Sequence, residues 1–368
     1  TLDRALELFY RQSPAARERG AHVFLDEIQV VDGWERFARR VLDTERVHLT
    51  ITGSSARMLS TEVATEFRGR GLAVEVLPFS AAERARALGP AVNGDAWPPG
   101  AALRSSLAAA FGEYLACGGF PSTLRMNEYD RIQSLQGFVE TVVLRDVAER
   151  HSATNLSALR ALVEAAFAAN AGPFSVSRLH GMLRSRGHAV TKATLLTYLD
   201  HVTDAYLLFL LPLRTRSARQ RAVNPRKVYA IDPGLAAAVT RAGASNLGAR
   251  FENAVYLELR HRLGGMTGTA LTYYRTADGL EVDFAVDLPS GDGTPLLYQV
   301  CADPSEPETM AREMRALEGA MRETGASAAT LLTVDAEGEY DVRAGRVDIV
   351  PAWRWFYDPE RPVRALRV

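Results

Sequence analysis

The sequence predicts an α/β protein of several units, and three patterns along the chain support this. Two apolar, β-branched-rich runs flank a segment with helical periodicity, and this strand, helix, strand order implies a parallel sheet. Further along, two helices and a hairpin follow one another, and the last third alternates between helix and strand signals. A length of 368 residues accommodates two or three domains.

The N-terminal strands are expected at Ala21–Leu25 and Val47–Ile51, both buried and both ending in polar residues. Trp34, Phe37, Val41 and Leu42 recur between them at the spacing of one helix face. A third short strand is expected at Ala73–Leu77, closed by Pro78.

The remaining elements are predicted from periodicity and turn residues. Residues 103 to about 170 read as helical, with a turn at 117–121. Next come helices at 173–187 and 191–208, a strand at 206–213 and its hairpin partner at 227–231. The last unit is expected to contain helices at 251–262 and 307–324 and strands at 271–275, 282–287, 296–300 and 329–334.

Composition restricts the partners. Lys and Arg number 43 against 44 Asp and Glu, so the net charge of -1 does not indicate a nucleic-acid binder, and any such binding requires a local patch. Two cysteines, Cys117 and Cys301, are too few for a disulfide framework and suit a reducing, cytoplasmic compartment as buried thiols. The longest apolar run, Ala205–Leu211, is far shorter than the ~20 residues of a membrane helix, so no membrane partner is expected.

Two polar segments at the strand ends carry the strongest chemical signal. Phe24–Gln29 reads FLDEIQ, and Thr52–Ser55 reads TGSS. Nucleotide hydrolysis needs a carboxylate to hold Mg²⁺ through water, a second carboxylate to polarise the attacking water, and a polar group near the γ-phosphate. Asp26, Glu27 and either Ser54 or Ser55 fit these roles, whereas the simpler interpretation is two acidic residues that cap a strand.

The segment from Phe24 to Phe79 resembles the AAA-type ATPase domain of prokaryotic proteins whose remaining chain is a domain of unknown function, the DUF4143 type. The resemblance implies a partial P-loop NTPase sheet, with Asp26 and Glu27 as the Walker B pair, Ser54 and Ser55 as sensor 1, and ATP and Mg²⁺ as ligands. It continues through GGFP at 118–121, RDVAER at 145–150, VYAIDPGLA at 228–236, FEN at 251–253 and EVDFAV at 281–286.

The phosphate-binding loop G-x-x-x-x-G-K-[ST] does not occur in the sequence. In the family it precedes the Walker B strand, and the sequence starts with Thr1, so we expect it upstream and expect these residues alone to bind nucleotide weakly or not at all. Arg70, in the segment Arg68-Gly69-Arg70, has two interpretations: an arginine finger that acts on a neighbouring subunit of a homo-oligomer, or a surface arginine beside a strand.

The helix, turn, helix and hairpin order is typical of a winged helix, and basic residues gather in it. Phosphate contacts along DNA would come from Lys192 on the second helix and from the hairpin. Winged helices also serve as protein-docking modules, so a protein partner is the alternative. The hairpin cations are Arg214, Arg216, Arg219, Arg221, Arg226 and Lys227.

The C-terminal unit resembles the PD-(D/E)xK nuclease core. Glu252 on a helix and Asp283 on a strand take the places of two carboxylates, while Gln299 and Cys301 stand where that core has a third carboxylate and a lysine. Because cysteine cannot replace the cation, we expect the fold to be retained and cleavage to be lost.

These interpretations give four domains and one leading function. The domains are a partial AAA core at 1–88, a helical lid at 101–170, a winged helix at 171–240 and a nuclease-like domain at 245–350. The leading hypothesis is an ATP-hydrolysing protein that couples nucleotide state to DNA or protein binding. The alternatives are a non-hydrolysing winged-helix DNA-binding protein and an active nuclease.

Overall fold

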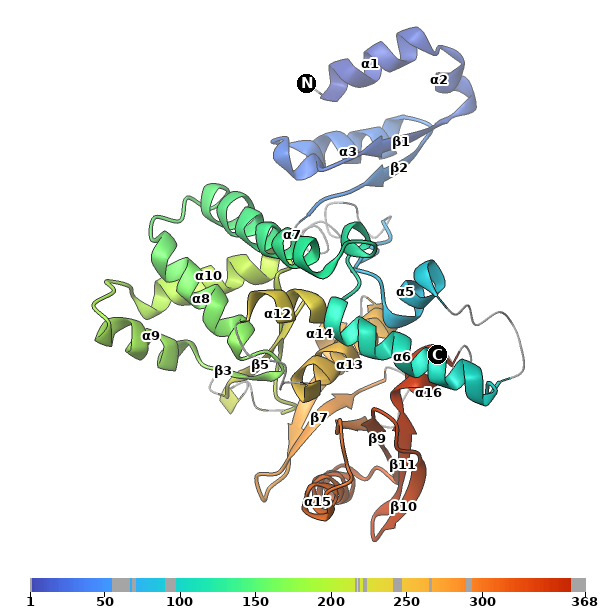
Figure 1. Ribbon diagram of the computed structural model, residues 1–368. Helices are drawn as coiled ribbons and strands as arrows, with labels where there is room; N and C mark the ends of the chain where they lie inside the picture. Colours follow the sequence, from blue (N-terminus) through green and yellow to red (C-terminus); the bar gives the residue numbers. More distant parts are fainter. Residues whose placement is uncertain are drawn as a thin grey trace. The chain divides into compact units, whose positions relative to one another are not determined.

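The computed structural model describes residues 2–54, 67, 71–89, 97–215, 217, 219–220, 224–240, 247–264, 267–288 and 293–358. Its contacts divide the chain into two compact units. The first comprises Thr1–Glu75 with Asp204–Tyr206, and the second comprises Val76–Thr203 with Leu207–Val368. The protein is of mixed α/β class (Figure 1).

The first unit is built on the predicted parallel strand pair. Strand β1 pairs with β2 from Ala21 opposite Val47 to Leu25 opposite Ile51. One buried cluster joins α1 to α3 through Leu6, Tyr10, Phe37 and Val41, and a second contains Ile28, Trp34, Ala38 and Phe67. The elements are α1 (Leu2–Gln12), α2 (Ala15–Arg19), β1 (Ala21–Leu25), the 3-10 turn η1 (Ile28–Val30), α3 (Trp34–Thr44) and β2 (Val47–Ile51).

Two expectations for this unit are wrong. Both strands alternate between half-buried and exposed residues instead of being buried, and Phe24 is 71% exposed. Residues 71–77 form no strand, and Leu72, Val74 and Val76 are exposed. A strand exists only where its backbone groups pair with a neighbour, and among the described residues of this unit only β1 and β2 pair.

The second unit starts with a helical region, as the periodicity predicted. Asn127 and Asn155 cap two of its helices by accepting a hydrogen bond from the backbone N–H of Asp130 and Ala158. Among the described residues, no helix is both long and apolar enough to cross a bilayer. The elements are α5 (Ala81–Leu88), α6 (Ala101–Cys117), the 3-10 turn η3 (Pro121–Thr123), α7 (Glu128–Thr141), the π-helical η4 (Val142–Glu149) and α8 (Leu156–Ala168).

A three-stranded antiparallel sheet with two helices follows. The helix, helix and hairpin come in the predicted order, but Gly172–Phe174 is a strand where the first helix was expected to begin. Strand β5 lies at the centre of the sheet, between β3 and β4. A single bridge from Leu213 to Tyr273 connects the chain after β4 to the next sheet. The elements are β3 (Gly172–Phe174), α9 (Val176–Ser185), α10 (Lys192–Asp204), β4 (Leu208–Leu211) and β5 (Arg226–Ala230).

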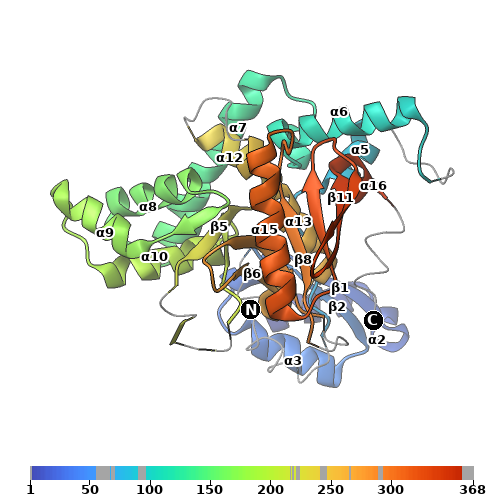
Figure 2. The same cartoon turned by 90° about the horizontal axis from the view of Figure 1, so that it is seen from below.

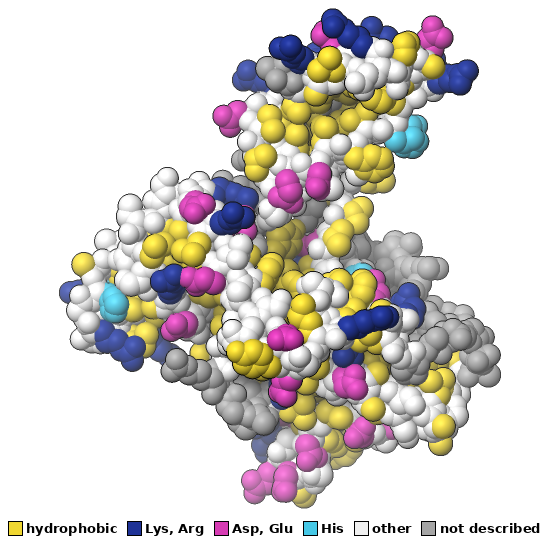
Figure 3. All heavy atoms as spheres, turned by 45° about the horizontal axis from the view of Figure 1, so that its top comes forward, with side chains coloured by type: hydrophobic (Ala, Val, Ile, Leu, Met, Phe, Trp, Pro, Cys, Tyr) yellow, Lys and Arg dark blue, Asp and Glu magenta, His cyan; other side chains and the backbone are white. Residues whose placement is uncertain are grey.

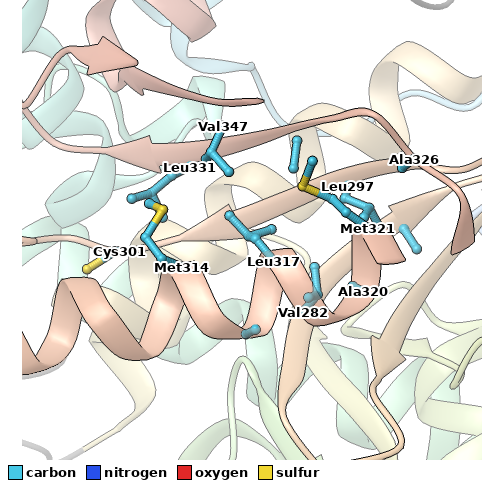
Figure 4. Close-up of a cluster of buried hydrophobic side chains, with 13 residues drawn as sticks. Val282, Leu297, Cys301, Met314, Leu317, Ala320, Met321, Ala326, Leu331 and Val347 are labelled. Atoms are coloured by element: carbon cyan, nitrogen blue, oxygen red, sulfur yellow. The ribbon is translucent and has the colours of Figure 1, made fainter. Parts of the chain in front are cut away.

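A six-stranded mixed sheet forms the C-terminal part, with strand order β10-β11-β9-β8-β7-β6. Helix α15 lies along one face of it (Figure 2), and Met314, Leu317 and Met321 of α15 pack on Leu297 and Leu331 of the sheet (Figure 4). The elements are α12 (Pro233–Val239), α13 (Leu247–Leu263), α14 (Thr267–Ala270), β6 (Leu271–Arg275), β7 (Glu281–Val286), β8 (Leu296–Val300), α15 (Pro307–Thr324), β9 (Ala328–Thr333), β10 (Gly338–Val342), β11 (Gly345–Pro351) and α16 (Ala352–Tyr357).

A buried carboxylate connects two segments that are far apart in sequence. Asp232 is 1% exposed and accepts hydrogen bonds from the backbone N–H of Gly119 at 2.6 Å and of Leu235 at 2.8 Å. Gly119 O in turn accepts a bond of 2.9 Å from Phe79 N. The GGFP turn and the start of α12 therefore depend on each other.

We expect Gly119→Ala to lower the free energy of unfolding by about 3 kcal/mol or more. A Cβ atom at this position would lie 1.9 Å from Phe79 O, which is itself backbone and cannot give way easily. Urea unfolding measures the change. The matched control is Gly112→Ala in α6, where no atom lies within 4 Å of the new methyl, and it should stabilise the helix by up to about 1 kcal/mol. Equal stability of the two variants would contradict the proposed close contact.

Candidate functional site

Asp26 and Glu27 lie at the carboxyl end of β1, directly beside the end of β2. The Thr52 hydroxyl donates a short hydrogen bond to Asp26 Oδ1 and accepts one of 3.1 Å from the Glu27 backbone N–H. Glu27 has a left-handed backbone with φ of 49°, a conformation that costs a non-glycine residue about 1–2 kcal/mol. The Thr52 hydroxyl thus fixes the turn that holds both exposed carboxylates at one edge.

Gln29 connects the second carboxylate to Ser54. Its Nε2 atom donates to Glu27 Oε2 at 2.6 Å and to Ser54 Oγ at 3.2 Å. The Oε1 atom of Gln29 is buried and has no hydrogen-bond partner among the described residues. Asp26, Glu27 and Ser54, which were predicted to share one site, are therefore brought together. Ser55 and Arg70 lie outside the described residues.

A cluster of charged side chains in the second unit surrounds Lys227 of β5. Its Nζ lies 2.5 Å from Glu252 Oε1, 3.1 Å from Glu281 Oε1 and 3.0 Å from Asp283 Oδ1. The Lys227 side chain is 2% exposed, and those of Glu252 and Asp283 are also largely buried. Glu252 and Asp283 are thus close, as the nuclease resemblance implied, and Lys227, which was expected among the hairpin cations, lies between them.

Gln299 and Cys301 occupy the neighbouring strand β8 and its end. Gln299 Oε1 accepts a bond of 3.1 Å from Asp283 N, and its Nε2 donates to Glu313 Oε2 at 2.7 Å. Cys301 is buried, and burial, with a smaller contribution from Glu313, raises the pKa of its thiol to about 11. Cys301 is thus a buried thiol, as expected, while Cys117 is half-buried rather than buried.

Strand β5 is also held to α13 by hydrogen bonds of two uncharged side chains, Tyr229 and Asn253. The Tyr229 hydroxyl donates to Glu252 Oε1 at 2.7 Å, and its ring stacks on that of Tyr256 at 4.2 Å. The side-chain amide of Asn253 accepts from Ala230 N at 2.9 Å and donates to Ala230 O at 3.0 Å. The FEN segment thus pairs with β5 much as a neighbouring strand would.

These contacts correct the expected basic hairpin. Lys227 is buried among carboxylates and is not available to DNA phosphates. Arg214 is paired with Asp287 at 2.9 Å and is 28% exposed. Lys192 and Arg219 are exposed, whereas Arg216 and Arg221 lie outside the described residues.

Burial shifts the protonation of the cluster. Desolvation, with the nearby Asp283 charge, raises the pKa of Glu252 to about 8, against the lowering effect of Lys227. Desolvation is also the main cause of the raised pKa of Tyr229, and Glu252 adds to it. Desolvation alone would lower the pKa of Lys227, but the surrounding negative groups, led by Asp283, outweigh it, so that this pKa lies above its ordinary value.

A cavity of about 1110 Å³ in the second unit is lined by none of the residues of the two clusters. Its walls come from α6, α7, η4, α8, α12 and α13, and combine apolar side chains with Arg131, Arg160, Glu164 and Arg250. It contains none of the predicted site residues, and no pattern in the sequence indicated it.

Comparison with known proteins supports the N-terminal assignment. Residues 1–85 match the family described as "AAA domain". The uncharacterized protein MJ1544 of Methanocaldococcus jannaschii is 30% identical over 342 residues, which cover 91% of this chain and 74% of that protein. The chain belongs to the family of MJ1544.

The other matches are more limited. Residues 108–246 match a domain of unknown function, DUF8612, which differs from the DUF4143 type that the sequence resembled. An uncharacterized protein of Haemophilus influenzae is 27% identical over 70% of this chain, which spans only 61% of that protein. One solved structure aligns with 83% of this chain over 75% of its own chain, at 12% sequence identity. It is a half-complex from a tetradecameric assembly of Thermococcus gammatolerans McrB AAA+ hexamers with bound McrC. Its TM-score of 0.23 is too low to support an argument.

Sequence reasoning missed three residues that organise the two clusters. Thr52 and Gln29 lie within the FLDEIQ and TGSS motifs, and their polar side chains beside the carboxylates were the available signal. Lys227 opens the predicted hairpin strand, where it was counted with the surface cations. A lysine followed by the apolar run Val228–Ile231 was the sign that it enters the core.

We expect Glu252→Gln to change how stability depends on pH. The pKa of Glu252 in the folded chain, about 8, lies above its ordinary value of 4.5. The contribution of Glu252 to the free energy of unfolding is therefore complete below pH 4.5 and is lost as pH rises through about 8, at up to about 1.4 kcal/mol per pH unit. The substituted amide can still accept from Lys227 and Tyr229 but does not ionise.

Urea unfolding between pH 5 and pH 9 tests this expectation. The Glu252→Gln variant should lose less stability over this range than the unmodified chain, and the exposed control Glu164→Gln should behave like the unmodified chain. Parallel curves for all three proteins would show that Glu252 is ionised in the fold.

Proposed function

We propose that the protein is an AAA-type ATPase whose nucleotide state controls binding of a macromolecule by the C-terminal half. The observation that carries this proposal is the hydrogen-bonded network of Asp26, Glu27, Gln29, Thr52 and Ser54 at the carboxyl ends of two parallel strands. The match of residues 1–85 to an AAA domain supports it.

In this proposal each polar group has its own task. Asp26 would hold Mg²⁺ through water, Glu27 would orient the attacking water, and Ser54 would contact the γ-phosphate. The phosphate-binding loop G-x-x-x-x-G-K-[ST] that this proposal requires does not occur in these 368 residues.

Gln29 moderates the basicity of the proposed site. Its amide donates to Glu27 Oε2 and so makes that oxygen a weaker base, while the second lone pair and Glu27 Oε1 can still accept from water. The same amide contacts Ser54, so a phosphate that binds Ser54 competes for Gln29 and releases Glu27. We expect γ-phosphate binding to activate Glu27 in this way.

We expect Glu27→Gln, in a protein that includes a phosphate-binding loop, to reduce ATP turnover at least about tenfold, which corresponds to about 1.4 kcal/mol of transition-state stabilisation. The amide keeps the size of the carboxylate but cannot polarise water. Phosphate release, measured with and without double-stranded DNA, gives the rate.

Glu7→Gln, an exposed acid on α1, is the matched control and should leave the rate unchanged. Absence of turnover in the unmodified protein, or equal turnover in the Glu27→Gln variant, would contradict the ATPase proposal. A binding module would then be the better account.

A second candidate, DNA contact by the three-stranded unit, is favoured by its winged-helix element order and by the exposed side chains of Lys192 and Arg219. Figure 3 shows basic and acidic side chains interspersed on the visible face, in keeping with a net charge of -1. DNA binding of this kind would use few phosphate contacts.

We expect the double variant Lys192→Ala, Arg219→Ala to reduce the slope of log K against log salt for double-stranded DNA by about 2, because each lost phosphate contact removes about 0.9. Fluorescence anisotropy over a salt series measures the slope. Arg343→Ala, an exposed arginine between β10 and β11, is the control. An equal effect of Arg343→Ala would indicate nonspecific attraction and exclude a role for α10.

A further inference from the structure

The Lys227 cluster contains more carboxylates than a buried lysine needs. Glu252 of α13 and Glu281 and Asp283 of β7 all place an oxygen within 3.1 Å of one ammonium nitrogen. Arg275 lies 3.3 Å from Glu281, so two cations face three acids. One well-placed carboxylate is enough to neutralise a buried ammonium.

Additional bonds keep these oxygens in place. Asp283 Oδ2 accepts a bond of 3.0 Å from Val300 N, which leaves Oδ1 for Lys227. Glu252 Oε1 is shared between Lys227 and Tyr229. The carboxylates therefore converge on one point from α13 and β7. Val300 N orients Asp283, and the Tyr229 hydroxyl orients Glu252.

We infer that the Lys227 ammonium occupies a cation site formed by Glu252, Glu281 and Asp283, and takes the place there of a divalent metal ion. Convergent carboxylate oxygens are the ligands that Mg²⁺ and Mn²⁺ use. The oxygens lie 2.5–3.1 Å from nitrogen, which suits N–H···O bonds, whereas Mg²⁺ needs about 2.0–2.1 Å. Accordingly, no group of three or more His, Cys, Asp and Glu side chains in the described ranges is arranged to hold a metal.

This inference assigns the cluster a role that does not involve cleavage. The ammonium is covalently part of β5, so the cation site fixes the three-stranded sheet to α13 and β7 and needs no free ion. The inference does not depend on the proposed ATPase activity.

Removal of the ammonium should uncover a metal site. In Lys227→Ala the shortened side chain leaves space among three acids, of which Glu281 still has a cationic neighbour, Arg275. We expect Mn²⁺ at about 1 mM to raise Tm by at least about 3 °C in this variant and by less than about 1 °C in the unmodified chain. The exposed Lys192→Ala serves as the lysine control, and the double variant Lys227→Ala, Asp283→Asn should lose the Mn²⁺ effect.

A second variant and a yield measurement cover the case in which Lys227→Ala does not fold alone. Lys227→Ala, Glu281→Gln has one acid fewer and keeps two ligands. Folded protein recovered in greater yield with Mn²⁺ than with EDTA, for either variant, supports the inference. Equal yields together with no Mn²⁺ shift overturn it. Mn²⁺ binding by the unmodified chain that Asp283→Asn abolishes also overturns it, because the cluster would then hold metal beside the lysine.

Discussion

The fold of the second unit depends on compensation of one buried charge. Moving an ammonium group out of water costs several kcal/mol even after relaxation, and only well-oriented acceptors offset this cost. Lys227 finds them on α13 and β7, so β5 can pack only where those two elements already lie at the correct distance. Loss of all its acceptors would leave a charge that the interior cannot solvate, and breaking a buried pair in this way typically costs about 3–5 kcal/mol.

The segment from Lys227 to Asp232 extends this dependence to other parts of the unit. After the lysine, the Ala230 backbone pairs with the Asn253 side chain, and Ala230 N also lies 2.9 Å from Asn170 Oδ1 at the end of α8. Asp232 then receives the Gly119 N–H. Burial raises the pKa of Asp232 to about 6 while the backbone N–H donors oppose the shift, so the carboxylate is held by its hydrogen bonds. This short segment thereby connects a sheet, two helices and a turn.

Local patterns predicted most of the elements, because periodicity depends on near neighbours. Strands β1 and β2 and helix α15 have the predicted bounds, and the parallel pairing of β1 with β2 followed from the helix between them. The segment 73–77 has an equally apolar alternation but forms no strand, since strand formation requires a partner and sequence alone does not supply one.

The candidate sites were predictable only in part, for a related reason. Asp26, Glu27 and Ser54 meet because strand ends in a parallel pair lie at one edge, a rule that acts locally. Lys227 reaches Asp283 across 56 residues, and no spacing rule links the two. Its place in the charged hairpin suggested a surface role, whereas the tertiary fold directs its side chain inward.

The two carboxylate clusters differ in what satisfies them, and this difference separates their chemistry. Asp26 and Glu27 are exposed and accept from a hydroxyl and an amide, which are neutral donors that leave the negative charge uncompensated. Such a cluster still attracts a hydrated cation and can release its donors at a small cost. Asp283 is buried beside a covalently attached cation and Glu252 is buried with a raised pKa, so neither offers an exposed negative charge to a free ion. An exposed pair with neutral donors is therefore suited to binding an exchangeable cation and its nucleotide, while a buried, ion-paired set is suited to holding the structure together.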